Sequence, residues 1–187
     1  MKKIVIFASG SGSNAEKIMQ YFDNHPTSEV ASVLSNKEGA GVLSIAKKFG
    51  VPTKVFSRED LNNDHILEHL SDIRPDLIVL AGFLWKFPKA IIEAFPGKIV
   101  NIHPALLPAY GGQGMYGLNV HRAVVQDRAP ETGVTIHYID EFYDEGATIF
   151  QAKVILDGNE TPEEVAAKVL KLEHLHFAQV IDQILNK

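Results

Sequence analysis

Asp76-Leu77-Ile78-Val79-Leu80-Ala81-Gly82 is the clearest β-strand pattern in the sequence. Its apolar residues are continuous, which is typical of a strand that is covered on both faces. A segment with helical spacing, Asp60–Ile73, precedes the strand and is closed by Arg74-Pro75. A second helical segment, Lys89–Phe95, follows it. A buried strand between two helices predicts one unit of an open parallel sheet.

The same alternation extends outward from this strand in both directions. The other expected strands are Lys3–Ala8, Val30–Leu34, Val51–Phe56, a strand beginning at Lys98, Thr132–Ile139 and Ala147–Ile155. The other expected helices are Ala15–Phe22, Gly41–Phe49, Leu118–Gln126 and a last helix that runs from the capping box at Thr161 to about Leu185. The segment 104–117, rich in proline and glycine, is predicted to be an irregular loop that lines a cleft. We therefore predict a single α/β domain over residues 1–187, with a mostly parallel Rossmann-like sheet and helices on both faces.

Composition excludes several classes of protein. A chain of 187 residues with 45% hydrophobic content suffices for one filled core. A net charge of -5 without a lysine or arginine run argues against nucleic-acid binding. The absence of cysteine excludes a thiol nucleophile, disulfides and thiolate metal sites. The apolar segment after Met1-Lys2-Lys3 is too short for a signal peptide, and no run approaches membrane-spanning length. We expect a soluble cytoplasmic protein with neither a nucleic-acid nor a membrane partner.

Asn101 and His103 stand one residue apart, directly before Pro104, where the strand that begins at Lys98 ends. Alternate residues of a strand face the same side, so a carboxamide and an imidazole would lie next to each other. A carboxamide donates hydrogen bonds without titrating, and imidazole carries protons near neutral pH. Such a pair can polarise a carbonyl and move a proton. Polar side chains that cap a turn are the alternative interpretation.

The turn after the first strand reads Gly10-Ser11-Gly12-Ser13-Asn14-Ala15 and fits the pattern G-x-G-x-x-G/A. Glycines let a phosphate approach the backbone, and a helix N-terminus offers free N–H groups. A nicotinamide site has an acidic residue after the second strand, where this sequence has Ser35-Asn36-Lys37. The hydroxyl and amide side chains of the turn therefore favour a single phosphate monoester over a dinucleotide. A tight turn without a ligand is the alternative.

Two carboxylates have possible functional roles. Asp144 lies in the acidic loop 140–146 between two strands, and it would favour an imidazolium if the loop folded back onto His103. A solvated hairpin is the simpler interpretation of that loop. Glu173 falls within the expected buried stripe of the last helix, which comprises Ala166, Leu170, Phe177, Ile181 and Ile184. A buried carboxylate needs a partner, which would be a buried lysine or the hydroxyls of a sugar.

Other patterns give no support for a metal or a serine nucleophile. His65 and His69 lie one helical turn apart, but no third ligand accompanies them, so we predict no metal site. The hydrolase motif G-x-S-x-G is absent.

Taken together, these motifs resemble the phosphoribosylglycinamide formyltransferases, folate-dependent enzymes of purine biosynthesis, over nearly the whole chain. The resemblance rests on Ser9-Gly10-Ser11-Gly12-Ser13-Asn14, Ser35-Asn36-Lys37, Leu80-Ala81-Gly82-Phe83, Asn101-Ile102-His103-Pro104-Ala105-Leu106-Leu107-Pro108 and Asp144. The run Asn-Ile-His-Pro-x-Leu-Leu-Pro with its downstream aspartate is typical of folate-dependent formyl transferases and hydrolases. The N-terminal phosphate loop separates this branch from relatives that formylate methionyl-tRNA or nucleotide sugars.

The resemblance implies a formyltransferase fold and a reaction between two small molecules. The formyl group of 10-formyltetrahydrofolate would pass to the amine of glycinamide ribonucleotide by direct attack through a tetrahedral intermediate, without a metal. The implied catalytic residues are Asn101, His103 and Asp144. The implied acceptor-binding residues are Ser11, Gly12, Ser13 and Asn14 on the phosphate, and Glu173 on the ribose. The implied folate-binding residues are Leu84, Trp85, Lys86, Phe87, Asn101, Asp140, Glu141 and Asp144.

The resemblance also implies a phosphate- and nucleotide-binding N-terminal half, a folate-binding and catalytic C-terminal half, and a monomer or homodimer. Four features depart from the family pattern. Trp85 replaces a frequent arginine, Asn119 a frequent histidine and Leu170 a frequent polar residue, and the loop 109–117 is longer than usual. Two alternatives remain open, namely hydrolysis of the same donor and a phosphate-sensing binding module. The hydrolases usually carry an extra N-terminal regulatory domain, whereas this sequence starts directly at its first strand.

Overall fold

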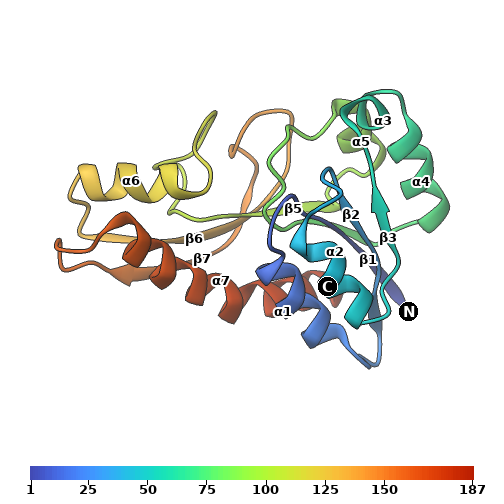
Figure 1. Cartoon of the computed structure of the whole chain (residues 1–187), viewed down its shortest axis with the longest axis horizontal. Coiled ribbons are helices and arrows are strands. Elements are labelled where there is room, and N and C mark those ends of the chain that lie inside the picture. Colours follow the sequence, from blue (N-terminus) through green and yellow to red (C-terminus); the bar gives the residue numbers. More distant parts are fainter.

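A seven-stranded sheet with the order β3-β2-β1-β4-β5-β6-β7 forms the centre of the molecule (Figure 1). The computed structural model describes all 187 residues. The strands are β1 (Lys2–Phe7), β2 (Ser28–Ser35), β3 (Thr53–Val55), β4 (Leu77–Leu80), β5 (Ile99–His103), β6 (Glu131–Tyr138) and β7 (Thr148–Ile155). The helices are α1 (Ser13–Phe22), α2 (Gly41–Lys48), α3 (Arg58–Asn62), α4 (His65–Ile73), α5 (Lys89–Ala94), α6 (Leu118–Gln126) and α7 (Pro162–Leu185).

The pairing of the strands confirms the predicted fold class. Strands β1 to β5 pair in parallel, whereas β6 pairs antiparallel with both β5 and β7. The strand order reverses at β1, since β2 and β3 lie on one side of it and β4 and β5 on the other. Ligands bind to open α/β sheets at such a switch point, outside the carboxyl ends of the strands.

The apolar parts of the central strands β1 and β4 are buried on both faces, as their continuous apolar residues predicted. In β1, Ile4 and Ile6 belong to one apolar cluster, and Val5 and Phe7 belong to another. The first cluster includes side chains of α1, α2, α6 and α7, and the second includes those of α3, α4 and α5. The helices accordingly cover the sheet on both faces (Figure 1).

One predicted helix was wrong. The segment Asp60–Ile73 forms two helices, α3 and α4, because Asp64 adopts a left-handed backbone conformation with φ of 67°. Ser57 begins α3 early through a capping box with Asp60, which the apolar spacing alone did not reveal. Helix α1 also begins earlier than expected, at Ser13, so that Ser13 and Asn14 lie in its first turn.

The predicted buried stripe of α7 was partly wrong. Leu170 is 37% exposed, and the residues buried along this part of the helix are Val165 and Val169. Ala166 and Leu170 face a cleft instead, because each stands one position further around the helix than Val165 and Val169, which fill the apolar core. Glu173 is 9% exposed and is therefore buried, as its position in the stripe predicted.

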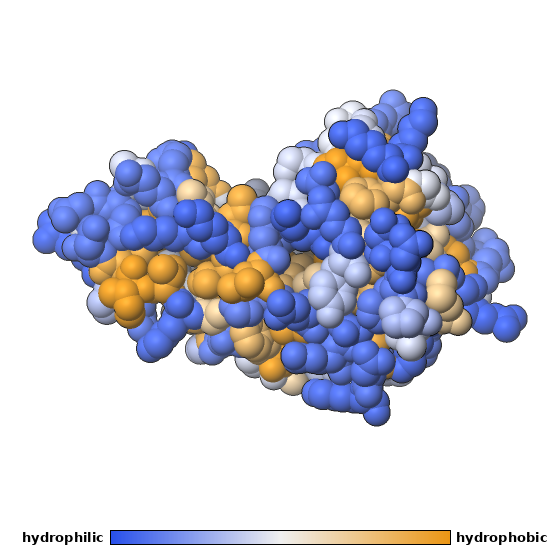
Figure 2. Space-filling model, turned by 90° about the horizontal axis from the view of Figure 1, so that it is seen from below, coloured by the Kyte–Doolittle hydropathy of each residue, from blue (hydrophilic) through white to orange (hydrophobic).

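One face of the molecule is mainly hydrophilic. Figure 2 shows hydrophilic side chains over most of this face, with hydrophobic ones in a band toward the end at the left and in a second patch at the upper right. None of the helices is both long enough and apolar enough to cross a membrane.

Candidate active site

The pairing of β5 with β6 places the polar residues at the carboxyl end of β5. Asn101 is paired with His137 and His103 with Thr135, so all four side chains belong to one face of the sheet. Thr135 also holds the loop that follows β5, because its Oγ1 accepts from the Leu107 N–H at 3.0 Å and donates to the Ala105 carbonyl at 2.7 Å. The end of β5 is therefore fixed both across the sheet and along the chain.

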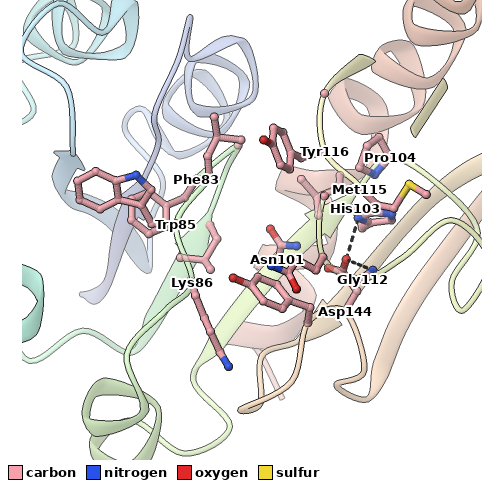
Figure 3. Close-up of a pocket in the computed structure, with 18 of the residues that line it drawn as sticks. Phe83, Trp85, Lys86, Asn101, His103, Pro104, Gly112, Met115, Tyr116 and Asp144 are labelled. Carbon is pink, nitrogen blue, oxygen red and sulfur yellow. Dashed lines mark hydrogen bonds and ion pairs between the residues drawn. The ribbon is translucent and has the colours of Figure 1, made fainter. Parts of the chain in front are cut away.

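The loop after β6 folds back onto His103, as the functional interpretation of Asp144 required (Figure 3). Asp144 Oδ2 lies 3.5 Å from His103 Nδ1 and accepts a hydrogen bond from the Gly112 N–H at 3.0 Å. His103 Nε2 donates to the Tyr110 carbonyl at 2.8 Å, and the ring is only 3% exposed. Both ring nitrogens therefore face oxygen acceptors.

His137 was not among the predicted site residues, although its ring contacts the side chain of Asn101. Its Nδ1 lies 2.9 Å from the Tyr138 carbonyl, and its Nε2 lies 3.2 Å from Asn101 Nδ2 and 3.6 Å from Asp144 Oδ1. The side chain is fully buried, and this burial lowers the pKa of His137, so that the ring is neutral near pH 7. The alternation of Thr135 and His137 in β6 was the sequence signal that could have revealed this polar pair.

A cleft of about 720 Å³ is lined by Asn101, His103 and Asp144. One end is lined by Asn14 of α1 and by Ala166, Leu170 and Glu173 of α7. The other end is lined by two loops, 82–87 after β4 and 139–144 after β6. The loop 112–117 lines a further wall, as predicted, together with Leu118 and His121 of α6. The cleft thus joins two chemically different ends through one polar centre.

The first end is built around a buried carboxylate. Glu173 Oε2 accepts a hydrogen bond from Asn14 Nδ2 at 2.6 Å. Burial raises the pKa of Glu173, although the hydrogen bond from Asn14 partly opposes this effect. The second polar atom of Asn14, Oδ1, is buried without a partner. No lysine contacts Glu173, so the alternative of a buried salt bridge is not realised.

The glycine-rich turn leads into α1 without a side-chain cap. Gly12 has φ of +83°, and a Cβ atom placed on it would lie 2.6 Å from Cβ of Val42. Because the N-cap residue Gly12 has no side chain, no capping side chain satisfies the first N–H groups of α1. Of the residues predicted to bind phosphate, Asn14 lines the cleft, whereas Ser11, Gly12 and Ser13 do not.

The second end carries the residues predicted to bind folate. Leu84, Trp85, Lys86 and Phe87 line it, together with Asp140 and Asp144. Glu141 does not line the cleft, because its carboxylate turns to Lys89 at 3.5 Å. Trp85, which replaces the frequent arginine, lies under the Arg58 guanidinium at 4.7 Å from the ring centroid. The lining of this end is therefore largely aromatic, with Lys86 as its cationic residue.

His121 is a further buried histidine in the cleft. Burial lowers the pKa of His121, and the nearby charge of His103 lowers it further. No group of three or more His, Asp or Glu side chains is arranged to hold a metal ion.

Comparison with known proteins identifies the family. The sequence profile of the formyl transferase family, described as "Formyl transferase", matches residues 2–181. Phosphoribosylglycinamide formyltransferase of Bacillus subtilis is 35% identical over 100% of this chain and 96% of its own length. The chloroplastic enzyme of that name from Arabidopsis thaliana is 38% identical over 98% of this chain. The chain spans 65% of the Arabidopsis protein and 61% of its counterpart from Vigna unguiculata.

The fold leads to the same relatives. The crystal structure of glycinamide ribonucleotide transformylase 1 from Geobacillus kaustophilus superimposes with a TM-score of 0.90, at 34% identity and 99% coverage of both chains. The predicted resemblance is thus confirmed by sequence and by structure. This chain belongs to the formyl transferase family, in the branch of the phosphoribosylglycinamide formyltransferases.

Proposed function

We propose that this protein transfers the formyl group of 10-formyltetrahydrofolate to the amine of glycinamide ribonucleotide, giving the N-formyl product and tetrahydrofolate. One observation carries the proposal. A carboxamide, an imidazole and a carboxylate meet at the centre of one cleft, and the two ends of that cleft differ in chemistry. The names of the relatives support the choice of acceptor and of reaction.

The acceptor belongs at the end that contains Asn14 and Glu173. Its phosphate would lie at the N-terminus of α1, with Ser11, Gly12 and Ser13 around it, because uncapped N–H groups favour an anion. Its ribose hydroxyls would donate to the Glu173 carboxylate, which has a single hydrogen-bond donor partner in the structure. This assignment gives the N-terminal half of the chain the phosphate-binding role.

The donor belongs at the other end. Its pterin would lie between the segment from Leu84 to Phe87 and the loop 140–144, where aromatic rings and backbone groups line the cleft. Its formyl group would then lie beside Asn101 and His103. Glu141 makes no direct contact with the donor in this arrangement, since it does not line the cleft and its carboxylate pairs with Lys89. The C-terminal half thereby contributes to the donor site and to catalysis.

The chemistry requires no covalent enzyme intermediate. The acceptor amine forms a bond to the formyl carbon, whose oxygen becomes an oxyanion. Asn101 donates a hydrogen bond to that oxygen, and His103 stabilises it as imidazolium. The bond from the formyl carbon to the folate nitrogen then breaks, that nitrogen takes up a proton, and the former amine loses one. Asp144, whose carboxylate faces His103 Nδ1, orders the water through which these protons pass.

In its present arrangement, His103 needs one rearrangement before it reaches an oxyanion. Its Nε2 donates to the Tyr110 carbonyl and its Nδ1 faces Asp144. One of these contacts must therefore be exchanged for the substrate oxygen. As part of the proposal, the protein works without a metal, in the cytoplasm, as a monomer or homodimer.

Incubation of the pure protein with the donor, with and without glycinamide ribonucleotide, tests this function. We expect loss of donor only when the acceptor is present. Loss that is independent of the acceptor would show a hydrolase instead. No loss of donor, with ligand binding retained, would show a phosphate-sensing module.

A further inference from the structure

The backbone fixes the tautomer of His137, the neighbour of Asn101 on β6. His137 Nδ1 lies 2.9 Å from the Tyr138 carbonyl, and a carbonyl oxygen only accepts hydrogen bonds. Nδ1 therefore carries the ring hydrogen. In a neutral imidazole the other nitrogen, Nε2, is then an acceptor with a free lone pair.

That lone pair decides which way the Asn101 carboxamide faces. The amide atom 3.2 Å from His137 Nε2 has to be a donor, which is Nδ2, as the structure has it. A carboxamide turned by 180° would place its oxygen against a lone pair and lose this hydrogen bond. With Nδ2 held in this way, its second N–H is left for the cleft, which Asn101 lines.

We propose that His137 is a positioning residue, which accepts a hydrogen bond from Asn101 at Nε2 and thereby directs the second N–H of Asn101 to the reacting oxygen. The inference rests on the proposed function, in which Asn101 stabilises the oxyanion. His137 itself is fully buried and does not line the cleft, so it acts only through its neighbours.

The charges around His137 support its neutral form. Asp144 Oδ1 lies 3.6 Å from Nε2, and a proton on Nε2 would direct the ring to this carboxylate and away from Asn101. Asp144 and Asp140 favour that proton, whereas His103 and burial oppose it, and burial has the largest effect on the pKa of His137. A neutral His137 therefore keeps its hydrogen bond from Asn101, and the Asp144 carboxylate remains available to pair with His103.

Two substitutions separate the two hydrogen bonds of the ring. His137→Gln keeps an acceptor at the approximate position of Nε2. His137→Asn keeps a donor for the Tyr138 carbonyl and has no atom near Asn101. We expect His137→Asn to lower kcat on the order of tenfold to a hundredfold, because one oriented oxyanion donor is worth about that much or more. His137→Gln should retain kcat within about threefold, and KM should change little in both variants.

The same substitutions in an Asn101→Ala background complete the experiment. If His137 acts through Asn101, His137→Asn should cause no further loss of kcat there. Equal losses in both backgrounds, or equal kcat values for the two His137 variants, would refute the positioning role. A wild type without formyl transfer would instead refute the proposed function.

A measurement on the wild-type protein does not depend on whether the variants fold. The ¹⁵N chemical shifts of the His137 ring at pH 7 should identify a neutral imidazole that carries its hydrogen on Nδ1. A hydrogen on Nε2, or on both nitrogens, would overturn the proposal.

Discussion

His103 and Asp144 show how a few contacts prepare a residue for chemistry. The imidazole is almost completely buried, yet an acceptor lies at each of its nitrogens, namely the Tyr110 carbonyl and the Asp144 carboxylate. A buried charge is costly unless it is paired and hydrogen-bonded, and this site provides both. Asp144 is itself held by the Gly112 N–H, so its position does not depend on His103 alone.

Replacement of Asp144 by asparagine tests this pairing. The variant keeps the shape of the side chain and removes its charge. We expect kcat at pH 7 to fall by about a hundredfold, because the carboxylate that faces His103 Nδ1 and orders the proton-relaying water is lost. The measurement is kcat at pH 7 for both proteins. An unchanged kcat would make Asp144 a structural loop residue.

Replacement of Glu173 by glutamine should stabilise the protein but weaken its binding of the acceptor. Burial raises the pKa of Glu173 above its unfolded value of about 4.3. The folded protein therefore loses stability as pH rises from about 4 through this raised pKa, and the whole loss is present above it. Glu173→Gln removes the charge and still accepts from Asn14. We expect a higher Tm than wild type at pH 7, and no difference at pH 4.

The same variant should bind the acceptor less well. Loss of hydrogen bonds to a charged group should raise the KM of glycinamide ribonucleotide about tenfold, with little change in the KM of the donor. Steady-state kinetics with each substrate varied in turn provides the measurement. A change confined to the KM of the donor would show that Glu173 belongs to the donor subsite instead.

At the scale of elements, the turn from β1 to α1 depends on one glycine. Gly12 has φ of +83°, and a Cβ atom there would meet Val42 of α2 at 2.6 Å. We expect Gly12→Ala to destabilise the protein by about 2–4 kcal/mol in urea denaturation, because positive φ and overpacking add. Gly10→Ala is the matched control, since a Cβ atom at Gly10 has no neighbour within 4 Å. Equal stabilities of the two variants would contradict this account of the turn.

The sequence predicted most elements and the juxtaposition of Asn101 and His103, for physical reasons that are local, whereas the place of Asp144 beside them was implied only by the family resemblance. Continuous apolar strands indicated a covered sheet, and the alternation of Asn101 and His103 placed both on one face. What the sequence did not reveal depends on pairing across the chain. His137 became part of the site only through the β5–β6 register, and Leu170 faces the cleft because the core contacts of α7 are made by its neighbours Val165 and Val169.

At the scale of the whole molecule, the cleft draws its residues from distant parts of the chain. Asn14, Asn101, Asp144 and Glu173 are brought together because β1, β4 and β5 end at one edge of the sheet and α7 returns beside α1. In the proposed function, one sheet holds the acceptor end and the donor end of the cleft, with Asn101 and His103 between them. Such an arrangement would orient two reactants for direct transfer, an effect worth several kcal/mol of the barrier.

Transfer of a labelled formyl carbon tests the central claim most directly. The protein is incubated with 10-formyltetrahydrofolate that carries ¹³C in its formyl group, together with glycinamide ribonucleotide, and the products are identified by NMR. We expect the label in the N-formyl group of the ribonucleotide, in an amount equal to the tetrahydrofolate released. Label recovered as free formate, or left in the donor, would contradict the account.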